Sequence, residues 1–302
     1  MTVTVTAPTV RVVVVTYSPG PALQDFLDTL ATATTASYDV VLADNGSVDG
    51  APQAAVGPGV ALLVTGGNVG YGAAANLGAS GAPHDWIVVA NPDMTWAPGS
   101  LDELVAAGGR WPRAGSLGPA IRTPQGRLYP SARAFPSLGR GTGHALLGWW
   151  WSTNPWTRSY RAEGGRPVEA PAGWLSGACL LVRREAFEAV GGFDPAYFMY
   201  CEDMDLGRRL ADAGWANIYV PTAVVTHTGG HATSRQPRAM LAEHHRALYR
   251  YLARQYDGVA RAPLRAVLAV GLLMRYLLAA RVTTVAEGAA PTRSADLLEL
   301  LS

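Results

Sequence analysis

The first 120 residues alternate short β-branched, apolar runs with stretches of helical periodicity, and this pattern constrains the fold more than any other feature. Strands are predicted over 10–15, 39–43, 61–64 and 86–90, and helices over 23–32, 73–79 and 100–108. Such alternation predicts an α/β fold, with a Rossmann-like, mostly parallel sheet flanked by helices. Ligands of such sheets bind beyond the carboxyl ends of the strands.

The segments that follow those four strands are all polar and turn-forming. They read Thr16-Tyr17-Ser18, Asp44-Asn45-Gly46-Ser47, the stretch from Gly66 to Gly72, and Asn91-Pro92-Asp93. Because parallel strands end at one edge of a sheet, we expect these segments to line one crevice.

The rest of the chain departs from this pattern. Residues 126–172 are rich in Pro, Gly, Arg and Trp, which is typical of a long ordered loop or lid. Beyond them the periodicity predicts a strand over 174–182, helices over 184–190 and 203–213, and a strand over 216–220 that stops at Pro221. From Pro237 onward it is helical, so we expect one domain over 1–235 and a helical C-terminal extension over 236–302.

Composition excludes several classes of protein. The balance of 24 basic and 23 acidic residues leaves no net field to hold nucleic acid. All the basic residues are arginines, which excludes Schiff-base and P-loop lysine chemistry. Two cysteines, Cys179 and Cys201, make no disulfide framework and favour a reducing compartment. The N-terminus lacks a signal-peptide pattern, and no eighteen apolar residues run unbroken, so no spanning helix is predicted.

Two strand ends place carboxylates where a nucleotide could bind. Asp44 could accept hydrogen bonds from the N–H of a pyrimidine base, although Asn-Gly and Asp-Gly pairs here equally indicate a simple turn. Asp93 could ligate Mg²⁺ or Mn²⁺, which prefer oxygen ligands and retain phosphate and water. His227 is a candidate second ligand, with a structural histidine as the alternative.

An acidic run, Glu202-Asp203-Met204-Asp205, begins the predicted helix over 203–213. Acidic residues in a first helical turn are ordinary, and Asp205 can pair with Arg209 four residues on. The helix dipole would also keep Asp203 ionised near neutral pH, as a general base for a sugar hydroxyl must be.

The run Gly70-Tyr71-Gly72-Ala73-Ala74-Ala75 fits G-x-G-x-x-A and supports a rival interpretation, a nicotinamide-dependent oxidoreductase. It follows the third predicted strand rather than the first, and it leaves the acidic run without a role. A glycine-rich turn that lets backbone approach a nucleotide accounts for it equally well.

Seven segments in order resemble the family 2 inverting glycosyltransferases of the GT-A fold, over about residues 10 to 230. They are Val-Thr-Tyr-Ser at 15–18, Ala-Asp-Asn-Gly-Ser at 43–47, Gly-Asn-Val-Gly-Tyr-Gly at 67–72, Asn-Pro-Asp at 91–93, Gly-Trp-Leu-Ser-Gly-Ala at 173–178, Gly-Gly-Phe-Asp at 191–194 and Phe-Met-Tyr-Cys-Glu-Asp-Met-Asp-Leu at 198–206. Within the family the chain looks most like the rhamnosyltransferases that build the actinobacterial cell-wall linker. Pro-Ser-Ala-Arg at 130–133 and Asn-Pro-Trp at 154–156 support that narrower match.

The resemblance implies a role for each matching residue. The donor nucleotide pocket would be lined by Thr16, Tyr17, Ser18, Asp44, Asn45, Asn68, Gly70 and Asn91, with Asp44 reading the base. Asp93 and His227 would hold the metal, and Asn91 stands where the family's D-x-D has its first carboxylate, so this site holds one charge fewer. Asp203 would be the general base and Glu202 would support it or touch the acceptor. Trp174, Ser176 and Gly177 would form the acceptor wall, and Arg133 would meet a diphosphate.

The same resemblance implies transfer of L-rhamnose from dTDP-L-rhamnose to polyprenyl-diphosphate-GlcNAc, with Mg²⁺ or Mn²⁺ and no nucleic acid, at the inner face of the cytoplasmic membrane. The alternatives are a family 2 enzyme for another nucleotide sugar, the oxidoreductase, or a non-catalytic nucleotide-sugar binder. Residues 263–280 read as a cationic apolar helix suited to a lipid interface, and the tryptophans at 149–156 as a second anchor. A core helix or a dimer helix is the alternative there, and a homo-oligomer is left open.

Overall fold

The computed structural model describes residues 8–136, 167–229 and 237–287, with backbone only for 237 and 281–287. It divides into two compact units. The first consists of the chain up to Pro195 together with Asp203–Gly229, and the second of Ala196–Glu202 together with the chain from Gly230 onward.

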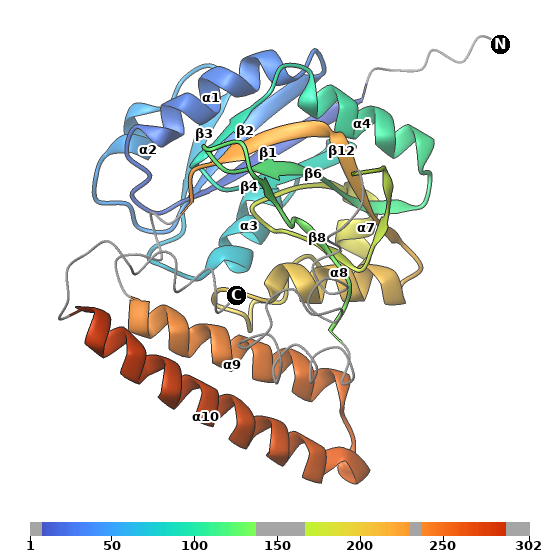
Figure 1. Cartoon of the computed structure of the whole chain (residues 1–302). Helices are drawn as coiled ribbons and strands as arrows, with labels where there is room; N and C mark the ends of the chain where they lie inside the picture. The colour runs from blue at the N-terminus through green and yellow to red at the C-terminus, as the bar shows by residue number, and fades with distance from the viewer. Residues whose placement is uncertain (1–7, 137–166, 230–236, 288–302) are drawn as a thin grey trace. The chain divides into compact units, whose positions relative to one another are not determined.

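The first unit is built on one mixed sheet (Figure 1). Its strands lie in the order β3 (Val60–Val64), β2 (Ser37–Asp44), β1 (Thr9–Thr16), β4 (Trp86–Ala90), β11 (Cys179–Arg183), β6 (Ala114–Arg122), β12 (Ala216–His227) and β5 (Met94–Trp96), with β7 (Leu128–Tyr129) paired to β6 and β9 (Ala170–Ala172) to β12. Strands β3, β2, β1 and β4 are parallel neighbours, whereas β11 and β5 run antiparallel to theirs. A separate two-stranded sheet pairs β8 (Ala132–Arg133) with β10 (Trp174–Leu175).

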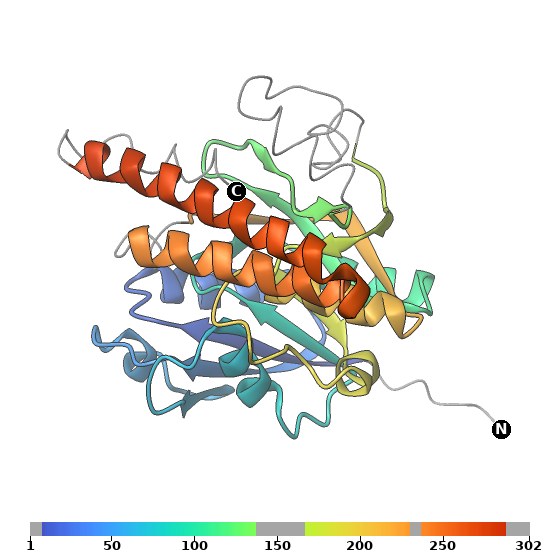
Figure 2. The same cartoon turned by 90° about the horizontal axis from the view of Figure 1, so that it is seen from below.

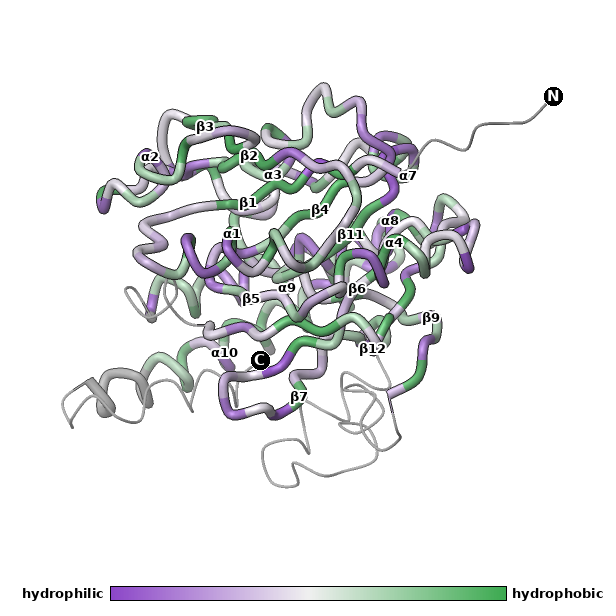
Figure 3. The backbone as a smooth tube through the Cα atoms, turned by 90° about the horizontal axis from the view of Figure 1, so that it is seen from above, coloured by the Kyte–Doolittle hydropathy of each residue, from purple (hydrophilic) through white to green (hydrophobic). Residues whose placement is uncertain are grey.

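Helices cover both faces of this sheet because its central strands are apolar on both sides. Val12 and Val14 of β1 belong to the core that includes α1 (Ala22–Ala33) and α4 (Ser100–Arg110). Val13 and Val15 point the other way, into the core that includes α3 (Tyr71–Ala79), α7 (Arg184–Ala189) and α8 (Glu202–Asp212). This follows from the two-residue period of a strand. The short α2 (Ala51–Ala54) follows β2, and Figure 3 shows β1, β4 and β11 as strongly hydrophobic. The predicted α/β class is confirmed.

The second unit is a pair of helices with one extra segment. Figures 1 and 2 both show α9 (Pro237–Gln255) and α10 (Ala262–Glu287) lying side by side, joined through the 3-10 turn Val259–Arg261. The predicted helical extension over 236–302 is therefore helical as far as it is described. Ala196–Glu202 also belongs to this unit, which the predicted boundary at 235 does not foresee.

Two predicted strands differ from the observed ones, and the observed strand β6 is not among those predicted. The strand expected to stop at Pro221 continues to His227, because a register shift between Val220 and Val224 lets β12 pass the proline, which has no N–H to donate. The strand predicted over 174–182 breaks into β10 and β11. Strand β6 was not predicted, since Gly115, Gly118 and Pro119 hide its pattern. The tryptophans at 149–156 and the Asn-Pro-Trp at 154–156 lie outside the described residues.

Candidate active site

Asp203 lies in the first turn of α8, and backbone N–H groups hold its carboxylate. Its Oδ1 accepts a hydrogen bond from the N–H of Met204 at 2.8 Å, and its Oδ2 accepts one from the N–H of Gly177, also at 2.8 Å. Gly177 lies in the break between β10 and β11. A Cβ atom there would come 3.1 Å from the Asp203 Cβ, so glycine permits this close approach. The broken strand therefore gives a backbone donor to the acidic turn.

Burial raises the pKa of the Asp203 carboxyl above its ordinary value of 3.8. The hydrogen bonds from Gly177 and Met204 and the positive charge of Arg133 lower this pKa without cancelling the effect of burial. That the helix start keeps this group ionised near neutral pH stays a prediction, and the structure adds that burial acts on the pKa in the opposite direction. A raised pKa suits a general base, whose best pKa lies near the working pH.

This raised pKa predicts the acid side of the pH–rate profile. Only the ionised carboxylate can accept a proton, so we expect kcat to rise with pH through a pKa above 3.8. A kcat profile measured with donor and acceptor at saturating concentrations would show this. If kcat rose with a midpoint at the ordinary aspartate pKa, or did not fall at acid pH at all, the result would contradict the role given to Asp203.

Asp93 and His227 form a second polar group at the same edge of the sheet, where β4 and β12 end and β11 begins. Asp93 follows β4, and the antiparallel pairing of β5 with β12 sets His227 opposite Met94, beside it. His227 Nε2 lies 3.0 Å from Asp93 Oδ1 and 3.2 Å from Asn91 Nδ2. The side chains of Asp93 and His227 are thus brought together, as the sequence predicts.

The donor set of this pair fits a hard divalent cation. Its potential ligand nitrogen, His227 Nε2, is the ring atom that faces the Asp93 carboxylate. Among the described residues no group of three or more His, Cys, Asp and Glu side chains could hold a metal. Mg²⁺ and Mn²⁺ tolerate so few protein ligands because substrate phosphate and water complete their coordination.

One short segment connects the acidic turn to this pair. The N–H of Asn91 donates to the carbonyl of Ala178 at 2.9 Å, and the neighbouring Gly177 donates to Asp203. The hydroxyl of Tyr71, a residue not predicted for the site, donates to the Gly177 carbonyl at 2.7 Å. Residues 177 and 178 therefore bind the acidic turn directly and reach the pair through Asn91, whose side chain contacts His227 at 3.2 Å.

Asp44 holds a turn at the carboxyl end of β2. The side chain is 2% exposed and accepts hydrogen bonds from the hydroxyl of Thr16 at 2.9 Å and from the N–H of Ser47 at 3.2 Å. Ser18 has a φ of 49°, and its hydroxyl accepts from the N–H of Val48. The hydroxyls of Thr16 and Ser18 thus bind protein groups, whereas Tyr17 is 39% exposed. Of the three predicted pocket residues, Tyr17 is the one open to a ligand.

Asn45 and Asn68 shape the glycine-rich loop. The Nδ2 of Asn45 donates to the carbonyl of Gly70 at 3.2 Å, and the Oδ1 of Asn68 accepts from the N–H of Gly70 at 3.1 Å. A Cβ atom on Gly72 would lie 2.8 Å from the Cβ of Phe193. The second glycine of the G-x-G-x-x-A run therefore serves helix packing, and no dinucleotide is needed to explain it.

Arg133 and Trp174 face each other across the β8–β10 pair. The guanidinium carbon of Arg133 lies 5.3 Å from the Trp174 ring centre and 5.4 Å from that of Tyr129, a residue not predicted for the site. Its Nη2 donates to the Tyr129 hydroxyl at 2.9 Å. The N–H of Ser176 donates to the carbonyl of Ser131 at 2.8 Å. Arg133 is therefore fixed by two rings and near enough to Asp203 to lower its pKa.

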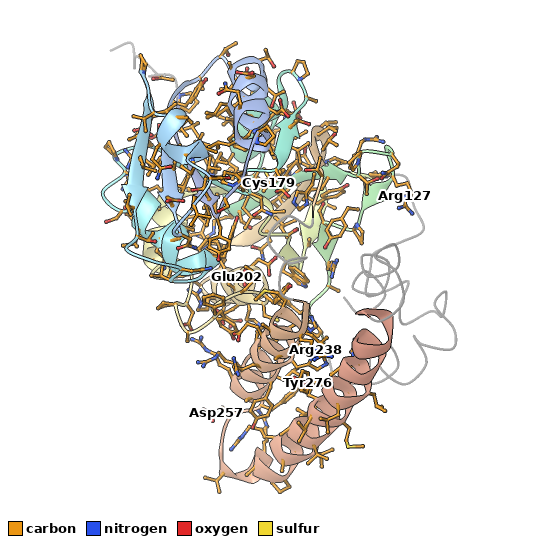
Figure 4. The ribbon with its side chains drawn as sticks, turned by 90° about the vertical axis from the view of Figure 1, so that its left-hand side faces the viewer. Arg127, Cys179, Glu202, Arg238, Asp257 and Tyr276 are labelled. Atoms are coloured by element: carbon orange, nitrogen blue, oxygen red, sulfur yellow. The ribbon has the colours of Figure 1, made fainter. Side chains whose placement is uncertain are left out.

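Glu202, the residue before Asp203, is buried. Burial, together with the nearby Glu202 carboxylate, raises the pKa of the Tyr200 hydroxyl to about 12. Tyr200 is therefore neutral at physiological pH. Figure 4 labels Glu202 at the start of α8.

Comparison with known proteins decides the family. Residues 11–191 match the family model described as Glycosyl transferase family 2, and residues 166–250 match one described as Glycosyltransferase like family 2. The chain belongs to glycosyl transferase family 2. The transferase is 56% identical over 277 residues to the N-acetylglucosaminyl-diphospho-decaprenol L-rhamnosyltransferase of Mycobacterium tuberculosis, covering 87% of this chain and 90% of that protein.

Solved structures confirm the GT-A fold. A mannosyltransferase from Pyrobaculum calidifontis, solved with GDP-Man and Mn²⁺, aligns with a TM-score of 0.58 at 20% identity, over 98% of the transferase and 79% of that chain. GalNAc-T7, solved with UDP, GalNAc and Mn²⁺, aligns with a TM-score of 0.56 at 18% identity, over 74% and 44%. The family assignment supports group transfer over the nicotinamide alternative.

Proposed function

We propose that the protein transfers L-rhamnose from dTDP-L-rhamnose to a polyprenyl-diphosphate-GlcNAc acceptor, with inversion at the anomeric carbon. The observation that carries the donor and acceptor is the high identity to the mycobacterial rhamnosyltransferase over nearly the whole of both chains. The geometry supports a single displacement, since Gly177 binds the Asp203 carboxylate and the adjacent Ala178 binds Asn91, whose side chain contacts His227 of the metal-binding pair.

In this mechanism Asp203 removes the proton from the acceptor hydroxyl. The freed oxygen attacks the anomeric carbon of the donor sugar, and the bond from that carbon to the nucleoside diphosphate breaks. The N–H groups of Gly177 and Met204 fix the base in place. One displacement at one carbon inverts its configuration.

Asp93 and His227 would hold a divalent cation, either Mg²⁺ or Mn²⁺, against the donor diphosphate. When bound, such an ion neutralises the charge of the leaving group. Tyr17 would stack on the nucleotide. Asp44, which holds the turn at the end of β2, would recognise the base. Arg133 would bind the diphosphate of the acceptor, because its planar guanidinium suits phosphate oxygens and is already oriented by Tyr129 and Trp174.

We also propose that α10 rests on an anionic membrane surface at the cytoplasmic face. By length and composition, Val259–Ala280, with a mean hydropathy of 1.6, could cross a membrane. Its large apolar side chains nevertheless form one exposed stripe, Val267, Val270, Leu273, Met274, Leu277 and Leu278. The opposite side carries partly buried residues such as Leu268 and Leu272. One apolar face fits interfacial binding.

The distribution of charged residues along the chain also favours a location of α10 on an anionic membrane surface. Residues 237–287 hold eight arginines and three acids, whereas residues 1–236 hold fifteen arginines and eighteen acids. The neighbouring α9 carries Arg246, whose side chain is 69% exposed, which opposes insertion of the helix pair. Basic residues beside an apolar stripe are attracted to anionic headgroups.

This location predicts the behaviour of a Leu273→Gln, Leu277→Gln double variant. Each leucine buried in the interface contributes on the order of 1.5–3 kcal/mol, so binding to phosphatidylglycerol vesicles should weaken at least tenfold. Co-sedimentation measures it, and Leu128→Gln, an equally exposed leucine on β7, is the matched control. Undiminished sedimentation of the double variant would contradict the location.

The assignment of donor and acceptor is tested with a panel of nucleotide sugars. The protein is incubated with each sugar, Mn²⁺ or Mg²⁺, and a short-chain polyprenyl-diphosphate-GlcNAc analogue, and the product is identified by mass. We expect a product one deoxyhexose heavier with dTDP-L-rhamnose. A product formed only with another nucleotide sugar would support the alternative family 2 activity, and no product with any of them would contradict the proposal.

A further inference from the structure

We infer that Tyr200 and His244 are positioning residues for the acidic turn, and that a row of aromatic rings ties the segment immediately before this turn to helix α10. The inference rests on the proposed function and deepens it. All the contacts that carry it lie within the second unit, which includes Ala196–Glu202 as well as α9 and α10.

The segment before Glu202 has an unusual backbone. Tyr200 and Cys201 have φ values of 68° and 62°, so two consecutive residues other than glycine lie in the left-handed region. Side chains disfavour that region, and residues remain there only where their surroundings hold them. Helix α8 begins at Glu202, the next residue. The direction in which Asp203 enters the helix therefore depends on what holds Tyr200.

Aromatic contacts hold it. The Tyr200 ring lies edge-on to His244 of α9, with ring centres 5.3 Å apart. His244 contacts His245 at 5.5 Å, and His245 contacts Tyr276 of α10 at 5.9 Å. Tyr276, labelled in Figure 4, projects from α10 toward α9. Edge-to-face packing at these separations is favourable and directional.

A second contact secures the same segment. Tyr197 is almost fully buried, and the guanidinium carbon of Arg250, on α9, lies 5.9 Å from its ring centre. The segment is thus attached to α9 at two points, three residues apart. We conclude that α9 sets the conformation of the chain immediately before the base.

The experiment removes the ring contact between Tyr200 and His244 by alanine substitution and restores an aromatic ring by phenylalanine substitution. In His244→Ala, kcat should fall by about 10²-fold, the loss typical of a base misplaced by about 1 Å. The KM for dTDP-L-rhamnose should stay within about twofold, because neither His244 nor Tyr200 is among the residues proposed to bind the donor. His244→Phe restores an aromatic ring and should recover most of kcat. Tyr200→Ala and Tyr200→Phe form a second pair with the same expected pattern.

Tyr249→Ala, a half-exposed tyrosine on α9 outside the row of rings, is the control and should keep wild-type kcat. Thermal melting of each variant separates misplacement from unfolding. Wild-type kcat in both alanine variants, or a failure of both Phe variants to recover kcat while folded, overturns the inference. A wild-type protein that transfers no rhamnose defeats the proposed function instead, so the two failures are distinguishable.

Discussion

Replacing Asp203 with Asn should lower kcat by about 10²- to 10⁴-fold, the range of a general base, while the affinity for dTDP remains that of the wild type. Asn keeps the shape of the side chain and can accept one of the two backbone hydrogen bonds, but it cannot take a proton. Steady-state kinetics and calorimetric titration with dTDP measure the two quantities. Asp212→Asn, at the exposed end of the same helix, should stay near wild-type activity. Full activity in Asp203→Asn would refute the role of the base.

A stability measurement checks the environment of the same carboxyl. Because its folded-state pKa is raised, protonated Asp203 contributes stability below its ordinary pKa of 3.8, and that contribution is lost as pH rises through the folded-state value. The melting temperature of the wild type relative to that of Asp203→Asn should therefore fall as the pH rises above 3.8. A difference that does not change with pH would contradict the raised pKa.

Replacing Asp93 with Asn should remove the dependence of donor binding on the divalent cation. A cation on a diphosphate is worth several kcal/mol, so kcat/KM should fall by about 10²-fold or more. Asn can still contact His227, which lies 3.0 Å from Asp93, so the fold should persist. Titration with dTDP in the presence and absence of Mn²⁺ measures the effect.

Binding of dTDP without metal is the internal control for this variant and should match the wild type. His227→Gln should show the same pattern with a smaller loss, since Asp93 supplies the negative charge. Metal-stimulated dTDP binding that survives in Asp93→Asn would show that the cation is held elsewhere.

Much of the site follows from strand order alone. Parallel strands bring Thr16, Asp44 and Asn91 to one edge, because each residue directly follows or ends a strand of the same sheet. The pairing of Asp93 with His227 was predicted from residue types, and β12 joins them by carrying His227 past Pro221. Such contacts are predictable because strand direction and alternation fix where side chains point.

Contacts made by backbone atoms were not predictable. Nothing in the sequence around Gly177 marks its N–H as the donor to Asp203, since that contact depends on a break within an apparently continuous strand. Likewise, the effect of burial on the pKa of Asp203 needs the packed structure. Thr16 and Ser18 were expected to line a pocket, yet short polar side chains at turns bind nearby backbone and carboxylate groups first.

The anomeric configuration of the product tests the central claim most directly. The purified product of dTDP-L-rhamnose and the lipid-linked acceptor analogue is examined by NMR, and the one-bond carbon–proton coupling at the transferred sugar gives its configuration. One attack assisted by Asp203 predicts the configuration opposite to that of the donor. A product that keeps the donor configuration would require two displacements or a front-face path, and would contradict the mechanism.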